Sequence, residues 1–418
     1  MHALDNRSED PGGLTLDQAR GDRNQARPQS LSFDSDERIT QQRLSLVWDG
    51  QAQGEDTYQV RSYVGHRDFT NRLPLAANGQ TSYERLFGGV GAHYSHVANW
   101  FGLGHKLTFG ADLESLRDDR DRNNNLVGGD KGALTSRQRE EARSLGLFIE
   151  NQTELSENWM LSLGLRHDAV RLNVDDRFLR DGDDSGERTL RDLNYSAGLS
   201  YRIDPNHTVY ARVATSFETP TVSELANPSG GGFNSSLEPA EALNQEIGFK
   251  GETAHWRYEA VVYRIDTRDE LVPYVNGRTF YRNAGSTRRD GLELSARWQP
   301  DEHWQLTTAY SLNDYSYRSF ENADGKRLPG IPVQSLFGEL SYSQDNWYAR
   351  INTSIYDRQY ADSANTARVA GYAVVNLRAG LQLKGWAENV EPYVGLDNLT
   401  DRRYYDNLRI NDSAGRYY

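Results

Sequence analysis

Apolar and polar residues alternate along much of this 418-residue chain. Trp347, Ile351 and Ile355 fall on one face of an extended segment, whereas Arg350 and Asn352 fall on the other. A period of two residues gives a β-strand one apolar face and one polar face. The pattern recurs from the first third of the chain to its end and predicts an all-β protein.

Short polar turns divide the alternating segments into sixteen expected strands. These strands cover roughly 38–49, 57–70, 82–98, 105–119, 138–155, 158–176, 189–204, 207–217, 241–252, 255–268, 285–299, 302–315, 332–344, 346–358, 367–384 and 387–398. Short turns are expected near 50, 102, 157, 205, 254, 301, 345 and 385, and longer connections at 117–139, 178–188, 218–241, 315–332 and 356–368. Short turns at one end and long loops at the other are typical of an antiparallel transmembrane β-barrel of the outer membrane.

The tryptophans support a membrane setting. Each of the eight lies beside an expected short turn: Trp48, Trp100, Trp159, Trp256, Trp298, Trp304, Trp347 and Trp386. Aromatic rings gathered at one end of the strands indicate a girdle at a membrane interface. A soluble antiparallel sandwich, with tryptophans capping its hairpins, is the alternative, because its strands alternate as well.

The composition agrees with a wet lumen inside a lipid-facing wall. Mean hydropathy is -0.79 and hydrophobic residues make up 37%, yet aromatic residues reach 11%, which is not typical of disorder. The chain has no cysteine, which excludes disulfides and thiolate chemistry, and its net charge of -13 argues against a nucleic-acid partner. Residues 1–37 are polar without a clear period, so we expect a loop or disordered segment there and the barrel domain at 38–418.

Three motifs follow one another in the second half of the chain. They read Phe-Glu-Thr-Pro-Thr-Val-Ser-Glu-Leu at 217–225 with Asn-Gln-Glu-Ile-Gly at 244–248, Asn-Ala-Gly at 283–285 with Gly-Leu-Glu at 291–293, and Asn-Leu-Thr-Asp-Arg-Arg-Tyr at 398–404. In this order they resemble the barrel portion of TonB-dependent outer-membrane receptors of the ferric siderophore and ferric citrate type. Glu218-Thr219-Pro220 stands where haem receptors of that family have Arg-Ala-Pro, which disfavours haem.

The resemblance implies a monomeric receptor for active uptake of a ferric chelate across the Gram-negative outer membrane. It also implies a plug domain that the TonB–ExbB–ExbD system displaces, and a barrel of twenty-two strands. Neither a plug nor a signal sequence is visible, and only sixteen strands are expected. We therefore expect a barrel truncated at both ends. A passive sixteen-strand porin and a soluble all-β enzyme or carbohydrate-binding repeat are the alternatives.

No catalytic constellation is present, and neither a cofactor nor a metal site is expected. His93 and His96 would point to opposite faces of one strand. The segment 181–186 with Asp192 has the carboxylate spacing of a calcium loop, but we favour an acidic hairpin loop. The charged run 117–122 is expected to be a solvated loop tip; its functional alternative is contact with lipopolysaccharide or an anionic chelate.

Two groups of residues are candidates for binding. Charge on a lipid face costs about 2–4 kcal/mol at the membrane midplane, so arginines within strands should face the lumen. By resemblance they would contact the plug, and simple hydration of the lumen is the alternative; they are Arg166, Arg212, Arg350 and Arg378. Arginine and tyrosine in long loops suit an anionic ferric chelate. The candidates for that contact are Tyr281, Arg282, Tyr315, Tyr317 and Arg318.

Overall fold

The computed structural model describes residues 2–228, 231–276, 278–383 and 390–405. Two short helices are present, α1 (Leu16–Gly21) and α2 (Pro28–Ser32). The strands are β1 (His2–Glu9), β2 (Asp36–Gln51), β3 (Thr57–Arg72), β4 (Gln80–Trp100), β5 (Leu103–Asn125), β6 (Lys131–Glu154), β7 (Trp159–Asp176), β8 (Gly186–Asp204), β9 (His207–Glu218), β10 (Ala240–Glu252), β11 (Trp256–Asn276), β12 (Arg278–Trp298), β13 (Trp304–Ser319), β14 (Gln334–Gln344), β15 (Trp347–Tyr356), β16 (Gln359–Tyr360), β17 (Arg368–Val369), β18 (Tyr372–Leu381) and β19 (Tyr393–Leu396).

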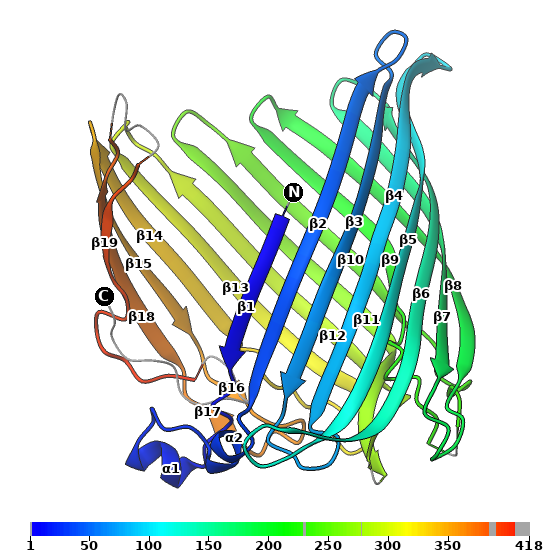
Figure 1. The fold of residues 1–418 in the computed structure, drawn as a ribbon. Coiled ribbons are helices and arrows are strands. Elements are labelled where there is room, and N and C mark those ends of the chain that lie inside the picture. The colour runs from blue at the N-terminus through cyan, green and yellow to red at the C-terminus, as the bar shows by residue number, and fades with distance from the viewer. Residues whose placement is uncertain (1, 229–230, 277, 384–389, 406–418) are drawn as a thin grey trace.

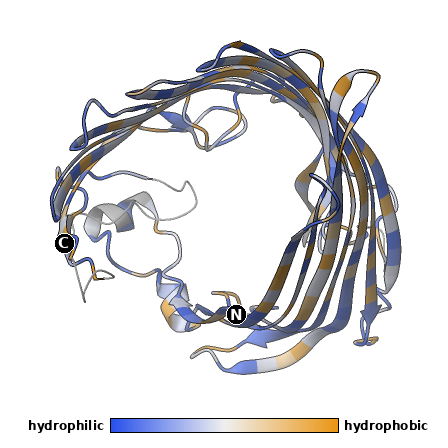
Figure 2. Ribbon diagram, turned by 90° about the horizontal axis from the view of Figure 1, so that it is seen from above, coloured by the Kyte–Doolittle hydropathy of each residue, from blue (hydrophilic) through white to orange (hydrophobic). Residues whose placement is uncertain are grey.

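Seventeen of these strands form one antiparallel sheet that curves around a central lumen (Figures 1 and 2). Each strand pairs with the next along the chain, from β1 with β2 to β18 with β19, and only the small β16–β17 hairpin stands apart. Helices α1 and α2 lie at the end of the wall that carries the long loops. Within the described residues, no helix is long and apolar enough to cross a membrane.

The two faces of the wall differ as the alternation predicts. Leucine and isoleucine side chains such as Leu46, Leu113, Leu163 and Ile351 are exposed, because they form the outer apolar belt. The seven described tryptophans are also partly exposed at strand ends beside the short turns, which agrees with an interfacial girdle. Trp386 and the expected turn near 385 lie outside the described residues.

Within the described residues all sixteen expected strands overlap strands of the sheet, whereas positions 384 and 387–389 of the last two lie outside the described residues. A seventeenth strand precedes them. Residues 1–37 were expected to be a loop, whereas His2–Glu9 forms β1 and pairs with β2 from Glu9↔Asp36 to His2↔Arg43. The polar sequence of β1 gives no apolar face to detect. Its strand is held instead by the ladder and by the ion pair between Arg7 and Asp36, 2.9 Å apart.

The prediction of a loop at 117–139 is also wrong, because β5 and β6 extend through most of this range. The run 117–122 is not a loop tip, since its side chains alternate across the wall. Asp118 is fully buried on the inner face, where Arg85 donates to both its carboxylate oxygens at 2.7 Å. Asp121 faces outward and pairs with Arg137 at 2.8 Å. Charged residues thus continue the strands here because they pair across the ladder.

Candidate functional site: the inner wall and the outer mouth

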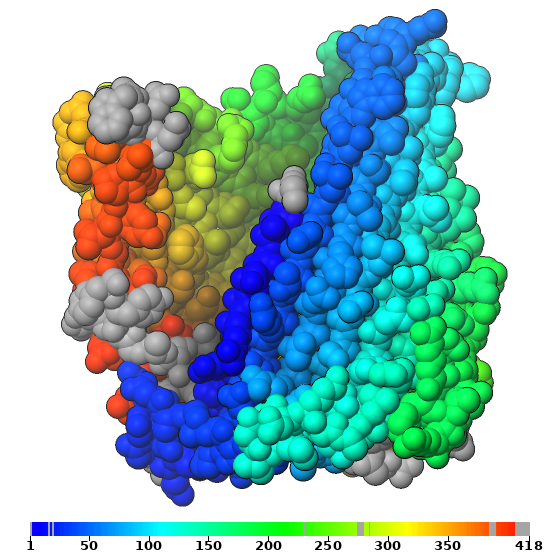
Figure 3. Space-filling view, in the orientation of Figure 1, coloured from blue at the N-terminus to red at the C-terminus, as the bar shows by residue number. Residues whose placement is uncertain are grey.

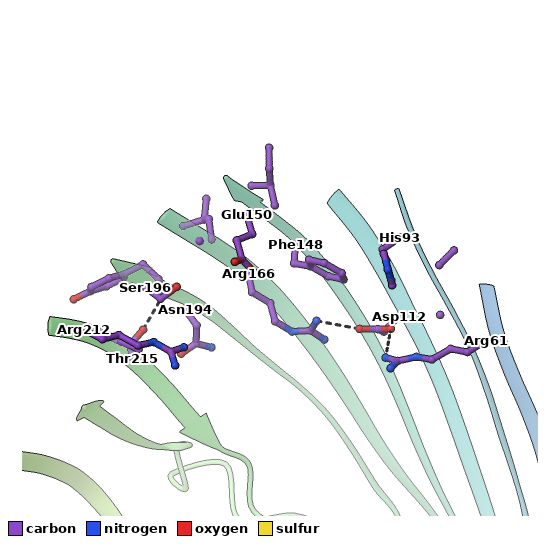
Figure 4. Close-up of a pocket in the computed structure, with 17 residues that line it drawn as sticks. Arg61, His93, Asp112, Phe148, Glu150, Arg166, Asn194, Ser196, Arg212 and Thr215 are labelled. Carbon is purple, nitrogen blue, oxygen red and sulfur yellow. Dashed lines mark hydrogen bonds and ion pairs between the residues drawn. The ribbon is translucent and has the colours of Figure 1, made fainter. Parts of the chain in front are cut away.

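Ion pairs lie flat along the inner wall across β3, β5 and β7 (Figure 4). Arg61 donates to Asp112 at 2.8 Å, and Arg166 bridges Asp112 at 3.0 Å to Asp168 at 2.8 Å. A glycine between the strands makes room, because a Cβ at Gly146 would come within 2.0 Å of the Arg166 guanidinium. Arg166 therefore lies on the inner face with its charge already satisfied by the wall.

A hollow of about 440 Å³ lies beside these ion pairs on the inner wall. Arg212 lines it together with Arg166 (Figure 4). It faces Glu246 directly across β9 and β10, yet no ion pair joins the two within the described part of the chain. The side-chain oxygen of the neighbouring Asn194 is buried and has no hydrogen-bond partner among the described residues. This part of the wall thus offers polar groups that the wall itself leaves unused.

Arg350 and Arg378 lie directly opposite each other on β15 and β18. Each guanidinium stacks on a tyrosine: Arg350 over Tyr348 with 4.7 Å to the ring centroid, and Arg378 over Tyr393 with 4.1 Å. Like charges in directly opposed positions repel each other. Neither arginine forms an ion pair with a described residue, so this pair presents positive charge to the lumen.

Four inward carboxylates face the lumen from β10, β11, β12 and β14, and none forms an ion pair with a described residue. They are Glu246, Glu259, Glu293 and Glu339. Sequence reasoning named the arginines and missed this acidic strip. The sequence contained a signal for these carboxylates, because Glu246 and Glu293 belong to the motifs at 244–248 and 291–293. We call these four carboxylates the acidic sector; Lys250 and Arg212 lie among them, and the basic pair of β15 and β18 lies beside them.

At the mouth, residues 219–228 and 231–239 between β9 and β10 fold back against the inner face. Leu225 and Leu237 are completely buried against Leu172 and Leu190 of the wall. Arg188 donates to the Asn234 carbonyl at 2.9 Å and further fixes this segment. The segment is thus an ordered part of the mouth, and a small apolar core holds it against the wall.

The second motif contacts this segment. The Glu238 amide donates to Asn283 Oδ1 at 2.7 Å, and Asn283 Nδ2 donates to the Glu238 carbonyl at 2.8 Å. In the third motif, Asn398 is buried and exchanges hydrogen bonds with the backbone of Arg402, both at 2.9 Å. These motif residues hold loops in place, which explains why the motifs report the fold more directly than the ligand.

The structure does not bring all five candidate ligand residues together. Tyr281 packs against the apolar core of the mouth, and Arg282 is ion-paired with Glu321. Tyr315 and Tyr317 follow the inward parity of β13. Tyr315 shares a 2.5 Å hydrogen bond with Tyr263, and Tyr317 contacts Ser363 Oγ at 3.2 Å. Arg318 is exposed on the outer face, near Asp290.

Among the described residues, no group of three or more His, Cys, Asp or Glu side chains is placed to hold a metal ion. In the loop at 177–185, Asp183 accepts from the Ser185 amide at 2.9 Å and Asp176 accepts from the Asp184 amide at 3.0 Å. These carboxylates therefore shape the loop itself.

Two curated receptors are similar to the chain. The probable TonB-dependent siderophore receptor PiuA of Acinetobacter baumannii is 25% identical over 291 residues, which is 63% of this chain and 37% of PiuA. The metal-pseudopaline receptor CntO of Pseudomonas aeruginosa is 26% identical over 283 residues, covering 65% of this chain and 38% of CntO. The chain therefore matches less than half the length of each relative.

Solved structures share the fold. The ferric citrate transporter FecA in its unliganded form superposes with a TM-score of 0.84 at 17% identity, over 99% of this chain and 65% of FecA. The siderophore receptor PiuA of Acinetobacter baumannii gives 0.76 at 16% identity, over 91% of this chain and 64% of that one.

A family match covers nearly the whole chain, over residues 3–399, and its description is "TonB dependent receptor-like, beta-barrel". Members of this family are outer-membrane receptors and transporters, so the match favours that class over a passive porin. The chain belongs to the TonB-dependent receptor-like β-barrel family.

Proposed function

We propose that this chain forms the barrel of a receptor for active uptake of a ferric siderophore or a similar ferric chelate. The names of the similar receptors support this ligand class. The observation that carries the proposal is the charge pattern of the inner wall. Four carboxylates on β10 to β14 and the pair Arg350–Arg378 face the lumen without ionic partners in the described chain. Leaving such charges unpaired is costly if another domain fills the lumen and excludes water from it.

The occupant that fits this pattern is a plug domain driven by TonB–ExbB–ExbD. Arginine or lysine side chains of the plug would face the acidic sector, and its carboxylates would face Arg350 and Arg378. Arg212 would meet a polar group of the plug beside Asn194. Arg166 has a different role, because Asp112 and Asp168 already satisfy it; it stiffens the wall under the plug.

The ligand would bind at the mouth, above the plug. Tyr315 and Tyr317 present phenol rings on the inner face, and Arg282 can exchange Glu321 for an anionic chelate. Tyr281 would support this site from the apolar core beneath it. Arg318 faces outward and is left out of the ligand set. Around the wall we place outer-membrane lipid and lipopolysaccharide, with the receptor acting as a monomer.

Uptake in an iron-starved host tests the proposal. The full-length gene would be expressed in hosts with and without TonB, and growth measured with a panel of ferric siderophores and ferric citrate. Rescue should require TonB, and Tyr317→Ala with Arg282→Gln should raise the ligand concentration needed. Arg318→Gln is the matched control and should behave like the wild type. Rescue independent of TonB would support a passive pore instead.

Plug contact is tested separately, by leakage. In the full-length receptor, Glu246→Gln with Glu293→Gln should loosen the plug and admit a large antibiotic that the outer membrane normally excludes. The control Glu241→Gln removes a carboxylate from the outer face, where it pairs with Arg268. This variant should keep the plug in place and should not admit the antibiotic. Equal sensitivity of the two variants would contradict plug docking on the acidic sector.

A further inference from the structure

Four arginines gather on the outer face of β5 to β8, at the edge of the apolar belt that is nearer the long loops. This outer arginine cluster consists of Arg117, Arg143, Arg171 and Arg191. The wall that carries it faces the viewer at the right of Figure 3, from cyan to green. On β6 and β8 the belt begins two residues further along the outer face, with Leu145 and Leu193, which are 44% and 54% exposed.

The strand register brings like charges together in this cluster. Arg143 lies directly opposite Arg171 across β6 and β7. Arg191 faces Ala169 across β7 and β8 and is therefore the diagonal neighbour of Arg171. Directly opposed like charges destabilise an antiparallel pair, and a diagonal neighbour is still within reach of long side chains. The arrangement therefore favours a bound anion between the strands.

The outer face of β10 to β12 shows the opposite arrangement. There Arg264 lies opposite Asp290, Arg288 opposite Asp266, and Arg268 opposite Glu241, and each pair forms an ion pair. Arginine at this height of the wall is thus normally matched by a carboxylate in register. The pairing of Arg143 with Arg171 departs from that rule.

Three carboxylates lie beside the cluster without neutralising it. Arg117 lies directly opposite Glu141 and 4.0 Å from Asp119. Arg143 contacts Glu141 at 3.1 Å and Arg171 contacts Glu187 at 2.7 Å, but the two guanidinium side chains are 63% and 57% exposed. Exposed pairs of this kind contribute little to stability, so an incoming anion can replace them. Four arginines and three carboxylates leave a local charge of +1 on a chain whose net charge is -13.

We propose that the outer arginine cluster binds the phosphate groups of a lipopolysaccharide molecule in the outer leaflet. Planar guanidinium groups match phosphate oxygens at two points each. The exposed leucines directly beside the cluster would contact the acyl chains of the same molecule, which is why the ligand is a lipid-borne phosphate and not a free one. The inference rests on the outer-membrane placement of the wall and is independent of ferric-chelate transport.

Binding of purified lipopolysaccharide to the detergent-solubilised chain tests this site. Arg143→Gln/Arg171→Gln/Arg191→Gln should weaken binding about tenfold or more. The control Arg264→Gln/Arg268→Gln/Arg288→Gln removes the same charge from the other wall and should bind like the wild type. Lipopolysaccharide stripped of its phosphates should bind both triple variants and the wild type equally weakly. Inorganic phosphate should not compete at millimolar concentration.

Glu187→Gln should change lipopolysaccharide binding in the opposite direction. It frees Arg171 from its carboxylate and should tighten binding, which a merely misfolded protein would not do; circular dichroism melting verifies the fold of each variant. Equal losses in the two triple variants, or binding that ignores the phosphates, would overturn the proposal. Displacement by inorganic phosphate would overturn the assignment to lipid. Because binding is measured on the purified chain, failure of uptake would leave this result standing.

Discussion

Tyr263 lies directly opposite Gly291 across β11 and β12, and its ring covers the glycine so closely that a Cβ there would come within 2.2 Å of a ring carbon. Similar inward pairs recur around the lumen, including Tyr210 with Gly248 and Tyr348 with Gly380. The large rings therefore lie against the wall and leave the lumen free.

Replacing Gly291 by alanine should push the Tyr263 ring off the wall and break its 2.5 Å hydrogen bond with Tyr315. We expect the free energy of unfolding to fall by about 1–3 kcal/mol, as for other overpacked sites. Denaturant unfolding of the chain in detergent micelles measures it. Gly338→Ala is the control, because the nearest atom to a Cβ there is 4.0 Å away. A similar loss in both variants would show that general strand effects, and not the ring, are responsible.

The buried carboxylate of Asp118 offers a sharper test of energetics. It accepts two 2.7 Å hydrogen bonds from Arg85, whose side chain is only 22% exposed. Asp118→Ala would leave that guanidinium without its partner, so we expect a loss of about 3–5 kcal/mol in unfolding free energy. Glu252→Ala removes one side of the solvent-exposed pair with Arg257 and should leave the unfolding free energy almost unchanged. Comparable losses in the two variants would contradict the role given to burial.

The alternation of side chains was sufficient to locate every expected strand of the wall, because one face of each strand meets lipid and must be apolar. It failed at β1 and at the outer halves of β5 and β6. There the strands leave the membrane, and pairs such as Arg7 with Asp36 and Arg137 with Asp121 replace apolar contacts. A charged sequence that alternates between two wet faces cannot be told from a loop by hydropathy alone.

Site residues were predictable only in part. Alternation placed Arg166 and Arg350 on the inner face, but it could not reveal that Asp112 neutralises the first whereas Arg378 opposes the second. Those relationships depend on the register between strands, which short motifs do not encode. For the same reason Arg318 was grouped with Tyr317, although neighbouring positions on a strand face opposite sides.

Acidification should loosen the turn between β2 and β3. Asp56 accepts hydrogen bonds from Tyr94 Oη at 2.6 Å, from His96 Nδ1 at 2.8 Å and from the Val97 amide at 2.9 Å. The Tyr94 hydroxyl, followed by these other donors, lowers the pKa of Asp56 from 3.8 to about 2. Because the folded pKa is depressed, this stabilisation is complete above about pH 4 and is lost as the pH falls toward 2.

Trp100, whose ring lies 5.9 Å from that of His96, can report this transition by fluorescence. Its emission should change between pH 4 and pH 2 in the wild type. Asp56→Asn should resemble the acid form at every pH, because an amide lacks the negative charge that the three donors stabilise. An unchanged pH profile in Asp56→Asn would assign the transition to another group.

The apolar core of the mouth should decide whether residues 219–228 and 231–239 stay against the wall. Leu225 is 0% exposed and Leu237 1%, so Leu225→Ala would leave a cavity and cost about 2–5 kcal/mol in local stability. We expect the segment to detach while the membrane-spanning ladder persists, because β9 and β10 remain paired below it. Limited proteolysis should then cut within this segment at concentrations that leave the wild type intact. Leu179→Ala is the control, since Leu179 lies in the neighbouring loop with 64% of its surface exposed and should not alter the cleavage pattern. If Leu225→Ala resists the protease as well as the control, the segment is held by its hydrogen bonds with Arg188 and Asn283 and not by the apolar core.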